Sequence, residues 1–122
     1  MTKIALIEDN AVISQMYRMK FESEGFDVKL ATNGESGIAL VKDFSPDIIL
    51  LDIQMPVMNG AEALKKIRKL ESAQETPVII LTNLGEEEAP KDLANLNISS
   101  YIVKANLTPS QVVQKVKETL NL

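Results

Sequence analysis

The 122-residue sequence contains no cysteine and no histidine. Without cysteine, the chain can form neither a disulfide framework nor a thiolate metal site. Without histidine, it lacks the commonest general base and the commonest transition-metal ligand. Any metal site must therefore be built from oxygen ligands, which magnesium and calcium prefer.

Long hydrophobic runs and concentrated positive charge are missing as well. No stretch approaches the ~18 apolar residues of a transmembrane helix, and the apolar run at residues 4–7 is too short for a signal peptide. The 13 basic and 17 acidic side chains give a net charge of −4. We interpret the densest basic run, residues 65–69, as the solvated face of a helix. These features predict a cytoplasmic protein that binds neither membranes nor DNA directly.

The length and composition suit one globular domain that spans residues 1–122. Short apolar runs alternate with amphipathic stretches. The runs predict strands at residues 4–7, 26–31, 48–51, 78–81 and 101–103, and the stretches predict helices at residues 11–24, 33–44, 61–70, 87–96 and from 109 onward. This alternation predicts an α/β fold, a flavodoxin-like doubly wound parallel sheet of five strands in the order 2-1-3-4-5, with five helices on its two faces.

Three helices carry local signals that the structure can test. In the first helix, Val12, Met16, Met19 and Phe21 recur at turn spacing and predict its apolar face. Pro90 falls near the start of the fourth helix, where proline is tolerated. The last helix begins with a capping box, Thr108-Pro109-Ser110-Gln111, that places proline at its first position.

Polar side chains follow four of the five predicted strands at the point where each strand ends. They are Glu8 and Asp9 after the first strand, Asp52 after the third, Thr82 after the fourth and Lys104 after the fifth. In an open parallel sheet these ends share one edge, and ligands bind at that edge. Three carboxylates there repel one another unless a cation lies among them. The joint pattern favours a functional site, although each residue alone has an ordinary structural role; Asp9 or Asn10, for example, can simply cap a helix.

These residues resemble the receiver domain of bacterial response regulators. The matching motifs are Ile7-Glu8-Asp9-Asn10, Leu51-Asp52-Ile53-Gln54-Met55-Pro56, Met58-Asn59-Gly60, Leu81-Thr82 and Tyr101-Ile102-Val103-Lys104. The resemblance covers essentially the whole chain. It implies a signalling phosphoacceptor rather than an enzyme with a separate substrate, one that assists its own phosphotransfer and autodephosphorylation.

The resemblance also implies a role for each matched residue. Asp52 would accept a phosphoryl group from a sensor histidine kinase or phosphotransfer protein. Asp9 and Asp52 would bind Mg²⁺, with Glu8 assisting and the backbone carbonyl of Gln54 as another ligand. Thr82 and Lys104 would contact the phosphoryl group, and Tyr101 would move with Thr82 in switching a surface toward an unknown downstream protein.

Some positions depart from the family pattern. Ala105 replaces the usual proline after Lys104, and a cis bond before alanine costs about 2.5–4 kcal/mol. We therefore predict a trans bond with Lys104 still pointing into the acidic pocket. Asn83 stands where a small residue is common, and Asn97 replaces a glycine but can take the left-handed conformation. Ser99 and Ser100 replace an acidic pair that is frequent in DNA-binding dimers, so we expect a monomer when the chain is unphosphorylated.

Two alternative functions are considered. A receiver-like scaffold that is never phosphorylated would be favoured by loss of Asp9, Asp52 or Lys104, but all three are present. A flavin or nucleotide enzyme on the same topology would have a loop rich in glycine, serine or threonine after the first strand. Glu8-Asp9-Asn10 is the opposite, and neither a Walker motif nor Gly-x-Gly-x-x-Gly occurs.

Overall fold

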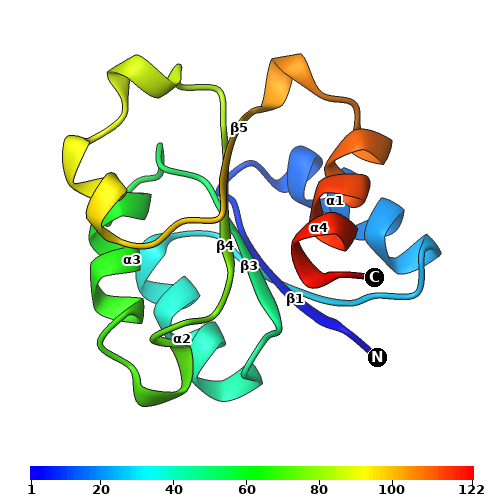
Figure 1. Cartoon of the computed structure of the whole chain (residues 1–122), viewed down its shortest axis with the longest axis horizontal. Coiled ribbons are helices and arrows are strands. Elements are labelled where there is room, and N and C mark those ends of the chain that lie inside the picture. Colours follow the sequence, from blue (N-terminus) through cyan, green and yellow to red (C-terminus); the bar gives the residue numbers. More distant parts are fainter.

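The computed structural model describes all residues, 1–122, and contains one five-stranded parallel sheet. The strands are β1 (Lys3–Ile7), β2 (Asp27–Ala31), β3 (Ile48–Leu51), β4 (Val78–Thr82) and β5 (Ser100–Val103). Their order is β2-β1-β3-β4-β5, and each neighbouring pair is parallel, as predicted. Four α-helices cover the sheet: α1 (Ala11–Ser23), α2 (Gly34–Phe44), α3 (Gly60–Ile67) and α4 (Pro109–Leu120). The helices α1 and α4 lie on one face and α2 and α3 on the other (Figure 1).

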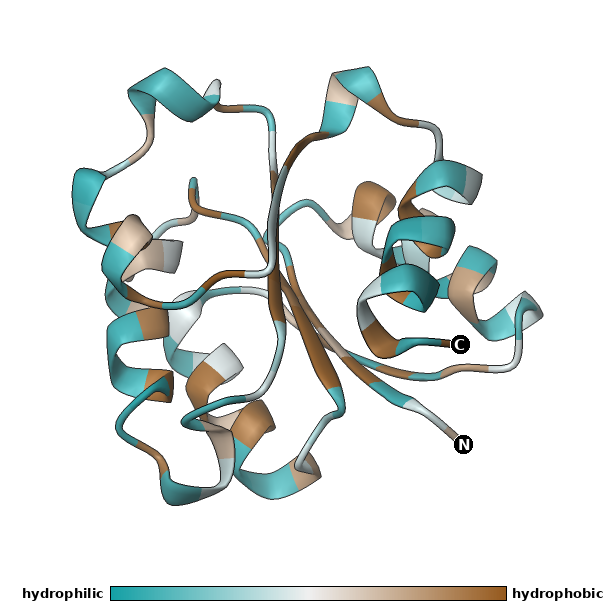
Figure 2. Ribbon diagram, viewed as in Figure 1, coloured by the Kyte–Doolittle hydropathy of each residue, from teal (hydrophilic) through white to brown (hydrophobic).

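The central strands form the core because their side chains point alternately to the two helical layers. Ile4, Leu6 and Leu50 belong to the apolar cluster that contains residues of α1 and α4. Ile7 and Leu51 belong to the second cluster, with residues of α2 and α3. Figure 2 shows the strands as a hydrophobic centre between helices with mixed surfaces. None of the helices combines the length and hydropathy that crossing a lipid bilayer requires.

Side-chain caps fix where the helices begin. The carboxamide oxygen of Asn10 accepts the backbone N–H groups of Val12 and Ile13, so Asn10 rather than Asp9 caps α1. Asn33 caps α2 and Asn59 caps α3. The predicted capping box of α4 is confirmed, with Thr108 and Gln111 each accepting the other's backbone N–H. These caps satisfy donors that would otherwise lack a partner.

The prediction of five helices is wrong, because residues 87–96 do not form the expected fourth α-helix. The chain there forms two short 3₁₀ helices, η2 (Glu86–Glu88) and η3 (Lys91–Asn95), and only four α-helices exist. Pro90 explains the break, since it lacks an N–H donor and disfavours helical backbone in the preceding residue. Ala89 and Pro90 are both extended, with ψ angles of 151° and 131°. The following Asn97 has φ +57°, the left-handed turn predicted for it.

Two basic side chains fasten this 3₁₀ segment to α3. Arg68 is the C-cap residue of α3. Its guanidinium donates to the carbonyl oxygens of Leu96 and Asn97 at 2.9 and 3.1 Å. It also donates to those of Ala73 and Thr76, at 3.0 and 2.7 Å, before β4. In addition, Lys65 of α3 forms an exposed ion pair with Asp92 of η3. These contacts hold the segment without the packing of a full helix.

The apolar face predicted for α1 is wrong for three of its four residues. Only Phe21 is buried, whereas Val12, Met16 and Met19 are 80%, 43% and 68% exposed. Tyr17 and Ser14 fill the inward positions instead. The hydroxyl of Ser14 donates to the carbonyl oxygen of Glu8 at 3.2 Å, which explains how a serine is tolerated there. The exposed residues Val12, Met16 and Met19 form an apolar stripe on α1.

The loop after β3 is tightly constrained. The Met58 N–H donates to the Pro56 carbonyl at 2.7 Å, and Val57 between them has φ +70°. This is a γ-turn of the rare positive-φ type, in a β-branched residue that disfavours it. At the end of the loop, the Gly60 N–H donates to the Ile53 carbonyl at 2.9 Å. Any Cβ on Gly60 would overlap the backbone of Asp52 and Ile53, so this position requires glycine.

Candidate functional site at the carboxyl edge of the sheet

The carboxyl ends of β1, β3, β4 and β5 bring the predicted site residues to one edge of the sheet. Glu8 and Asp9 follow β1, Asp52 follows β3, and Thr82 ends β4. Lys104 follows β5 and begins the short 3₁₀ helix η4 (Lys104–Asn106). Glu8, Asp52 and Thr82 are buried, whereas Asp9 is exposed. The sheet topology therefore assembles groups that are up to 96 residues apart in the sequence.

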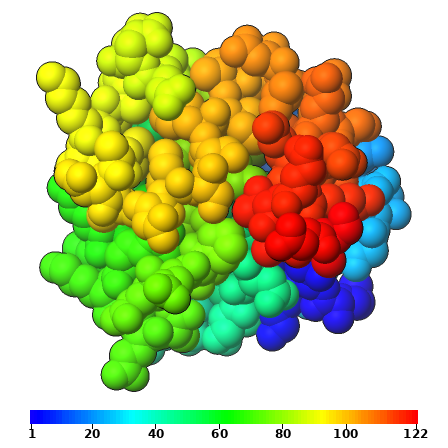
Figure 3. Space-filling view, viewed as in Figure 1, coloured from blue at the N-terminus to red at the C-terminus, as the bar shows by residue number.

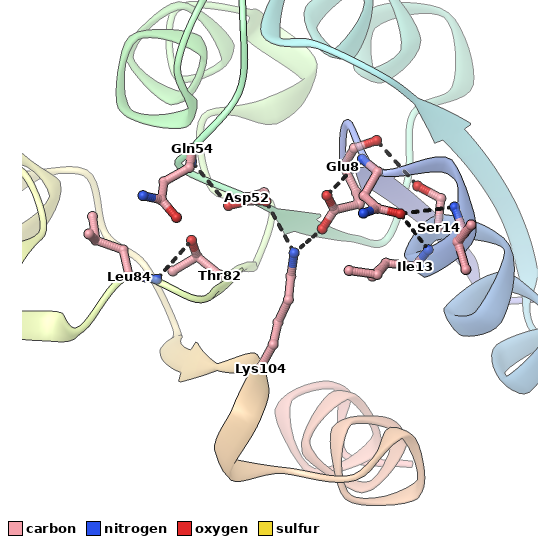
Figure 4. A network of polar contacts seen from close by, with 10 residues as sticks. Glu8, Ile13, Ser14, Asp52, Gln54, Thr82, Leu84 and Lys104 are labelled. Atoms are coloured by element: carbon pink, nitrogen blue, oxygen red, sulfur yellow. Dashed lines mark hydrogen bonds and ion pairs between the residues drawn. The ribbon is translucent and has the colours of Figure 1, made fainter.

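Lys104 lies at the centre of this arrangement. Its ammonium group contacts a carboxylate oxygen of Glu8 and lies 3.1 Å from Oδ2 of Asp52. Figure 4 shows the side chain reaching from η4 to a point between the two carboxylates. The chain contains no cis peptide bond, so the Lys104–Ala105 bond is trans as predicted. The lysine reaches the pocket without the proline that usually follows it.

The pKa values of Glu8 and Lys104 both differ from those of exposed side chains. Burial raises the pKa of the Glu8 carboxyl, and the hydrogen bonds from Lys104 and the Asn10 backbone offset only part of this shift. Burial alone would lower the pKa of Lys104, but the contacts with Glu8 and Asp52 outweigh it and raise that pKa. Lys104 therefore remains charged in the pocket.

The three carboxylates form a group that can hold a cation. One oxygen from each of Glu8, Asp9 and Asp52 lies within 4.8 Å of the others. Carboxylate oxygens suit a hard divalent ion such as Mg²⁺, which needs only one or two of them because it keeps several waters. The Gln54 N–H donates to Oδ1 of Asp52 at 3.0 Å, so the backbone of Gln54 lies beside the same group. The residues present fit magnesium.

Thr82 and Tyr101 meet at Leu84. The Leu84 N–H donates to Oγ1 of Thr82 at 3.4 Å, and the Tyr101 hydroxyl donates to the Leu84 carbonyl oxygen at 2.8 Å. A longer contact joins the same hydroxyl to the Gly85 carbonyl at 3.4 Å. Tyr101 is half-buried, and both burial and the nearby acidic residues raise the pKa of its hydroxyl. Leu84 is not identifiable from the sequence, because its contribution comes from backbone groups that carry no residue-specific signal.

Ser14 and Asn10 were also not recognised as supports of the site. Asn10 donates its backbone N–H to Oε2 of Glu8 at 3.0 Å, and Ser14 binds the Glu8 carbonyl. Together they fix the backbone and the carboxylate of Glu8 from the start of α1. A serine on the buried face of an amphipathic helix was the signal in the sequence that could have revealed this role.

Comparison with known proteins agrees with this geometry. The profile of the response regulator receiver domain family matches residues 4–117. The transcriptional regulatory protein ResD of Bacillus subtilis is 37% identical over 119 residues, which cover 98% of this chain and 48% of ResD. The chain spans about half or less of the length of the curated relatives that head this comparison.

Solved structures show the same fold. A CheY-like response regulator receiver domain protein from Methanospirillum hungatei superposes with a TM-score of 0.90 at 27% identity, covering 99% of this chain and 94% of that one. The receiver domain of the sensor histidine kinase PA1611 from Pseudomonas aeruginosa has a TM-score of 0.86 at 24% identity and covers 96% and 95% of the two chains. That structure has a magnesium ion coordinated in its active site cleft. The chain described here belongs to the response regulator receiver domain family.

Proposed function

We propose that residues 1–122 form a single receiver domain in which Asp52 accepts the phosphoryl group. The position of Lys104 carries this proposal, because the ammonium group contacts both Glu8 and Asp52 at the carboxyl edge of the sheet. A phosphoryl group brings about two negative charges to a carboxylate that is already negative. Transfer to Asp52 therefore needs a neighbouring cation, and Lys104 supplies one.

The protein residues perform defined tasks in the transfer. A carboxylate oxygen of Asp52 attacks phosphorus, a P–O bond forms, and the P–N bond to the donor histidine breaks with the imidazole as leaving group. Lys104 then pairs with a phosphoryl oxygen, and the Thr82 hydroxyl donates to another. Asp9 and Asp52 would hold Mg²⁺, with Glu8 assisting and the Gln54 carbonyl as a further ligand. The ion would supply additional positive charge during transfer.

The switch in this proposal runs through Leu84. In the structure described here, Thr82 and Tyr101 bind the N–H and the carbonyl of this one residue. A phosphoryl group on Asp52 would attract the Thr82 hydroxyl and thereby change the contact with Leu84. Since Tyr101 holds the same residue, its side chain would move as well. Phosphorylation would thus bias a surface that includes Tyr101 between two states.

The partner that donates the phosphoryl group would be a sensor histidine kinase or a phosphotransfer protein. The apolar stripe on α1 supports docking beside the acceptor. Its first residue, Val12, lies three positions after Asp9, and the stripe then continues along the helix through Met16 and Met19. Exposed apolar surface of this kind is typical of protein interfaces. The stripe would align the donor histidine with Asp52.

Further properties follow from the same proposal. The domain would be cytoplasmic and monomeric when unphosphorylated, would not bind DNA itself, and would control a downstream protein. It would act on no separate substrate, and water would slowly hydrolyse its own acyl phosphate. A scaffold that is never phosphorylated is not favoured, because Asp9, Asp52, Thr82 and Lys104 are all present at one edge of the sheet.

The proposal is tested by incubating the chain with a small acyl phosphate and Mg²⁺. We expect the mass of one phosphate to be added, and we expect excess chelator to prevent it. The variant Asp9→Ala should lose labelling as well, whereas Asp43→Ala, an exposed carboxylate on α2, should retain it. Normal labelling in chelator or in Asp9→Ala would remove magnesium from the mechanism.

A further inference from the structure

Methionine is the side chain that a mild oxidant attacks first in this protein. The sequence contains five methionines but no cysteine, tryptophan or histidine. A peroxide oxidises the thioether to a sulfoxide: an S–O bond forms, the O–O bond of the peroxide breaks, and water or an alcohol leaves. Reductases that are specific for methionine sulfoxide reverse the reaction. Exposed methionines are therefore candidate sites of reversible modification.

The five methionines differ in their accessibility to solvent. Met1, Met19 and Met16 are 88%, 68% and 43% exposed. Met55 and Met58, in the loop after β3, are half-buried, and Met55 packs against the apolar cluster of α2 and α3. Since susceptibility to oxidation follows exposure, we expect Met1, Met16 and Met19 to be oxidised before the two half-buried residues.

Met16 and Met19 are two of the three residues of the apolar stripe on α1. They are three positions apart in the helix, so their side chains are neighbours, and Met16 is one turn from Val12. A thioether is apolar and flexible and adapts to the surface of a partner, whereas a sulfoxide is polar and chiral. Burying the sulfoxide oxygen without a hydrogen-bond donor costs free energy. Oxidation would therefore weaken the binding of a partner to the stripe.

The same oxidation leaves the core and the acceptor site unchanged. Neither Met16 nor Met19 belongs to the two apolar clusters of the core. The buried side of α1 consists of Ser14, Tyr17 and Phe21, and Ser14 also holds the backbone that follows β1. The face that would be oxidised and the face that supports the acceptor site are thus separate. A chain with two sulfoxides would still accept a phosphoryl group from a small donor.

We propose that Met16 and Met19 form a reversible oxidation site that lowers phosphotransfer from a protein donor. The inference rests on the proposed docking of that donor on the α1 stripe, and it adds a means of regulating this surface. The oxidant is hydrogen peroxide or an organic peroxide. In the oxidised chain the donor docks less well, and a reductase restores docking by converting the sulfoxides back to thioethers.

The test compares the untreated and the oxidised chain as phosphoryl acceptors. The purified chain is treated with hydrogen peroxide, the peroxide is removed, and peptide mass mapping locates the sulfoxides. We expect the rate of transfer from a histidine kinase active on this chain to fall about tenfold, as for the loss of an anchor residue in an interface. Labelling by a small acyl phosphate should be unchanged, and methionine sulfoxide reductase should restore the rate with the kinase.

The variant Met16→Leu/Met19→Leu separates the stripe from the other methionines. It keeps the stripe apolar but cannot form the sulfoxides, so the kinase should phosphorylate it at the same rate before and after peroxide treatment. Met1 remains in this variant and lies elsewhere on the surface, in a hollow that Asp47 and Leu120 also line. Figure 3 shows the first residues of the chain in dark blue at the lower edge of the molecule, below the red atoms of α4.

The matched control is Met55→Leu/Met58→Leu, which also removes two methionines but leaves the stripe intact. Its rate with the kinase should fall on oxidation as that of the wild type does. A full rate in the oxidised wild type, or an equal loss in Met16→Leu/Met19→Leu, would overturn the proposal. If untreated Met16→Glu is impaired while the oxidised wild type is not, only the oxidation site is wrong. If neither is impaired, the proposed docking on the stripe is wrong as well.

Discussion

The ammonium nitrogen of Lys104 lies 3.1 Å from Oδ2 of Asp52, although 52 residues separate them in the sequence. The same nitrogen contacts Glu8, so one cation serves two buried carboxylates. Asp9 lies within the same group. Three carboxylates against one ammonium leave an excess of negative charge, and a divalent ion would offset that excess.

Lys104→Met should lower the stability of the protein in the absence of magnesium. The substitution leaves Glu8 and Asp52 without their cation, and breaking a buried ion pair in this way is strongly destabilising. We expect the free energy of unfolding to fall by about 3–5 kcal/mol, measured by urea denaturation in chelator. Added Mg²⁺ should stabilise this variant more than it stabilises the wild type, because more uncompensated negative charge faces the ion.

The double variant Glu8→Gln/Lys104→Met is the control for that measurement. It removes one negative charge together with the lysine, so it should be more stable than Lys104→Met alone. Equal stability of wild type and Lys104→Met in chelator would show that the lysine does not compensate the carboxylates.

The fold was largely predictable because the strands are short apolar runs and the helices carry caps such as Asn33 and Thr108. The errors occurred where a local signal was ambiguous. Pro90 is compatible with the start of a helix, but the extended Ala89 and Pro90 divide the segment into two 3₁₀ helices. The spacing of Val12, Met16 and Met19 is compatible both with a helix face that packs against the core and with one that is exposed to solvent. Only the tertiary structure shows that Tyr17 faces the core together with Phe21, which was the one correctly predicted residue of that face.

Val57→Asn should stabilise the protein. Val57 has φ +70° in the γ-turn after β3, a conformation that a β-branched residue adopts with strain and that asparagine tolerates. We expect the free energy of unfolding to rise by about 1 kcal/mol. Val12→Asn is the matched control, since both valines are 80% exposed but Val12 lies in a helix. If the two substitutions have the same effect, the strain at Val57 does not contribute to stability.

Arg68→Met should cost more stability than Lys65→Met, although both basic residues attach the 3₁₀ segment to α3. Arg68 donates to four backbone carbonyl oxygens, and hydrogen bonds from charged donors are worth more than exposed ion pairs. We expect a loss of about 2 kcal/mol for Arg68→Met and less than about 1 kcal/mol for Lys65→Met. Hydrogen exchange should also become faster at Leu96 and Ser99 in Arg68→Met. A larger loss in Lys65→Met would reverse this assignment.

Met16→Glu should impair phosphotransfer from a protein donor but not from a small acyl phosphate. The substitution places a charge in the apolar stripe on α1, where a partner helix would otherwise bury methionine. We expect the rate with a histidine kinase active on this chain to fall at least tenfold. Gln114→Glu, an exposed change on α4, is the control and should leave both rates unchanged. Equal rates for Met16→Glu and wild type with the protein donor would exclude the stripe as its docking surface.

The site was predictable to the level of its strand ends. Parallel topology alone indicates that Glu8, Asp9, Asp52, Thr82 and Lys104 share one edge. The individual contacts between them were not predictable from spacing, because they depend on the short 3₁₀ helix η4, which the sequence pattern did not indicate. The role of Leu84 was equally inaccessible, since any residue offers the same N–H and carbonyl.

Asp52 as the single phosphoacceptor is the central claim, and intact-mass spectrometry of Asp52→Asn tests it most directly. Wild type and variant are incubated side by side with a small acyl phosphate and Mg²⁺. The asparagine is nearly the same size, so the fold should be retained, which far-ultraviolet circular dichroism verifies. We predict one added phosphate on the wild type and none on Asp52→Asn. Equal labelling of the two proteins would contradict the account.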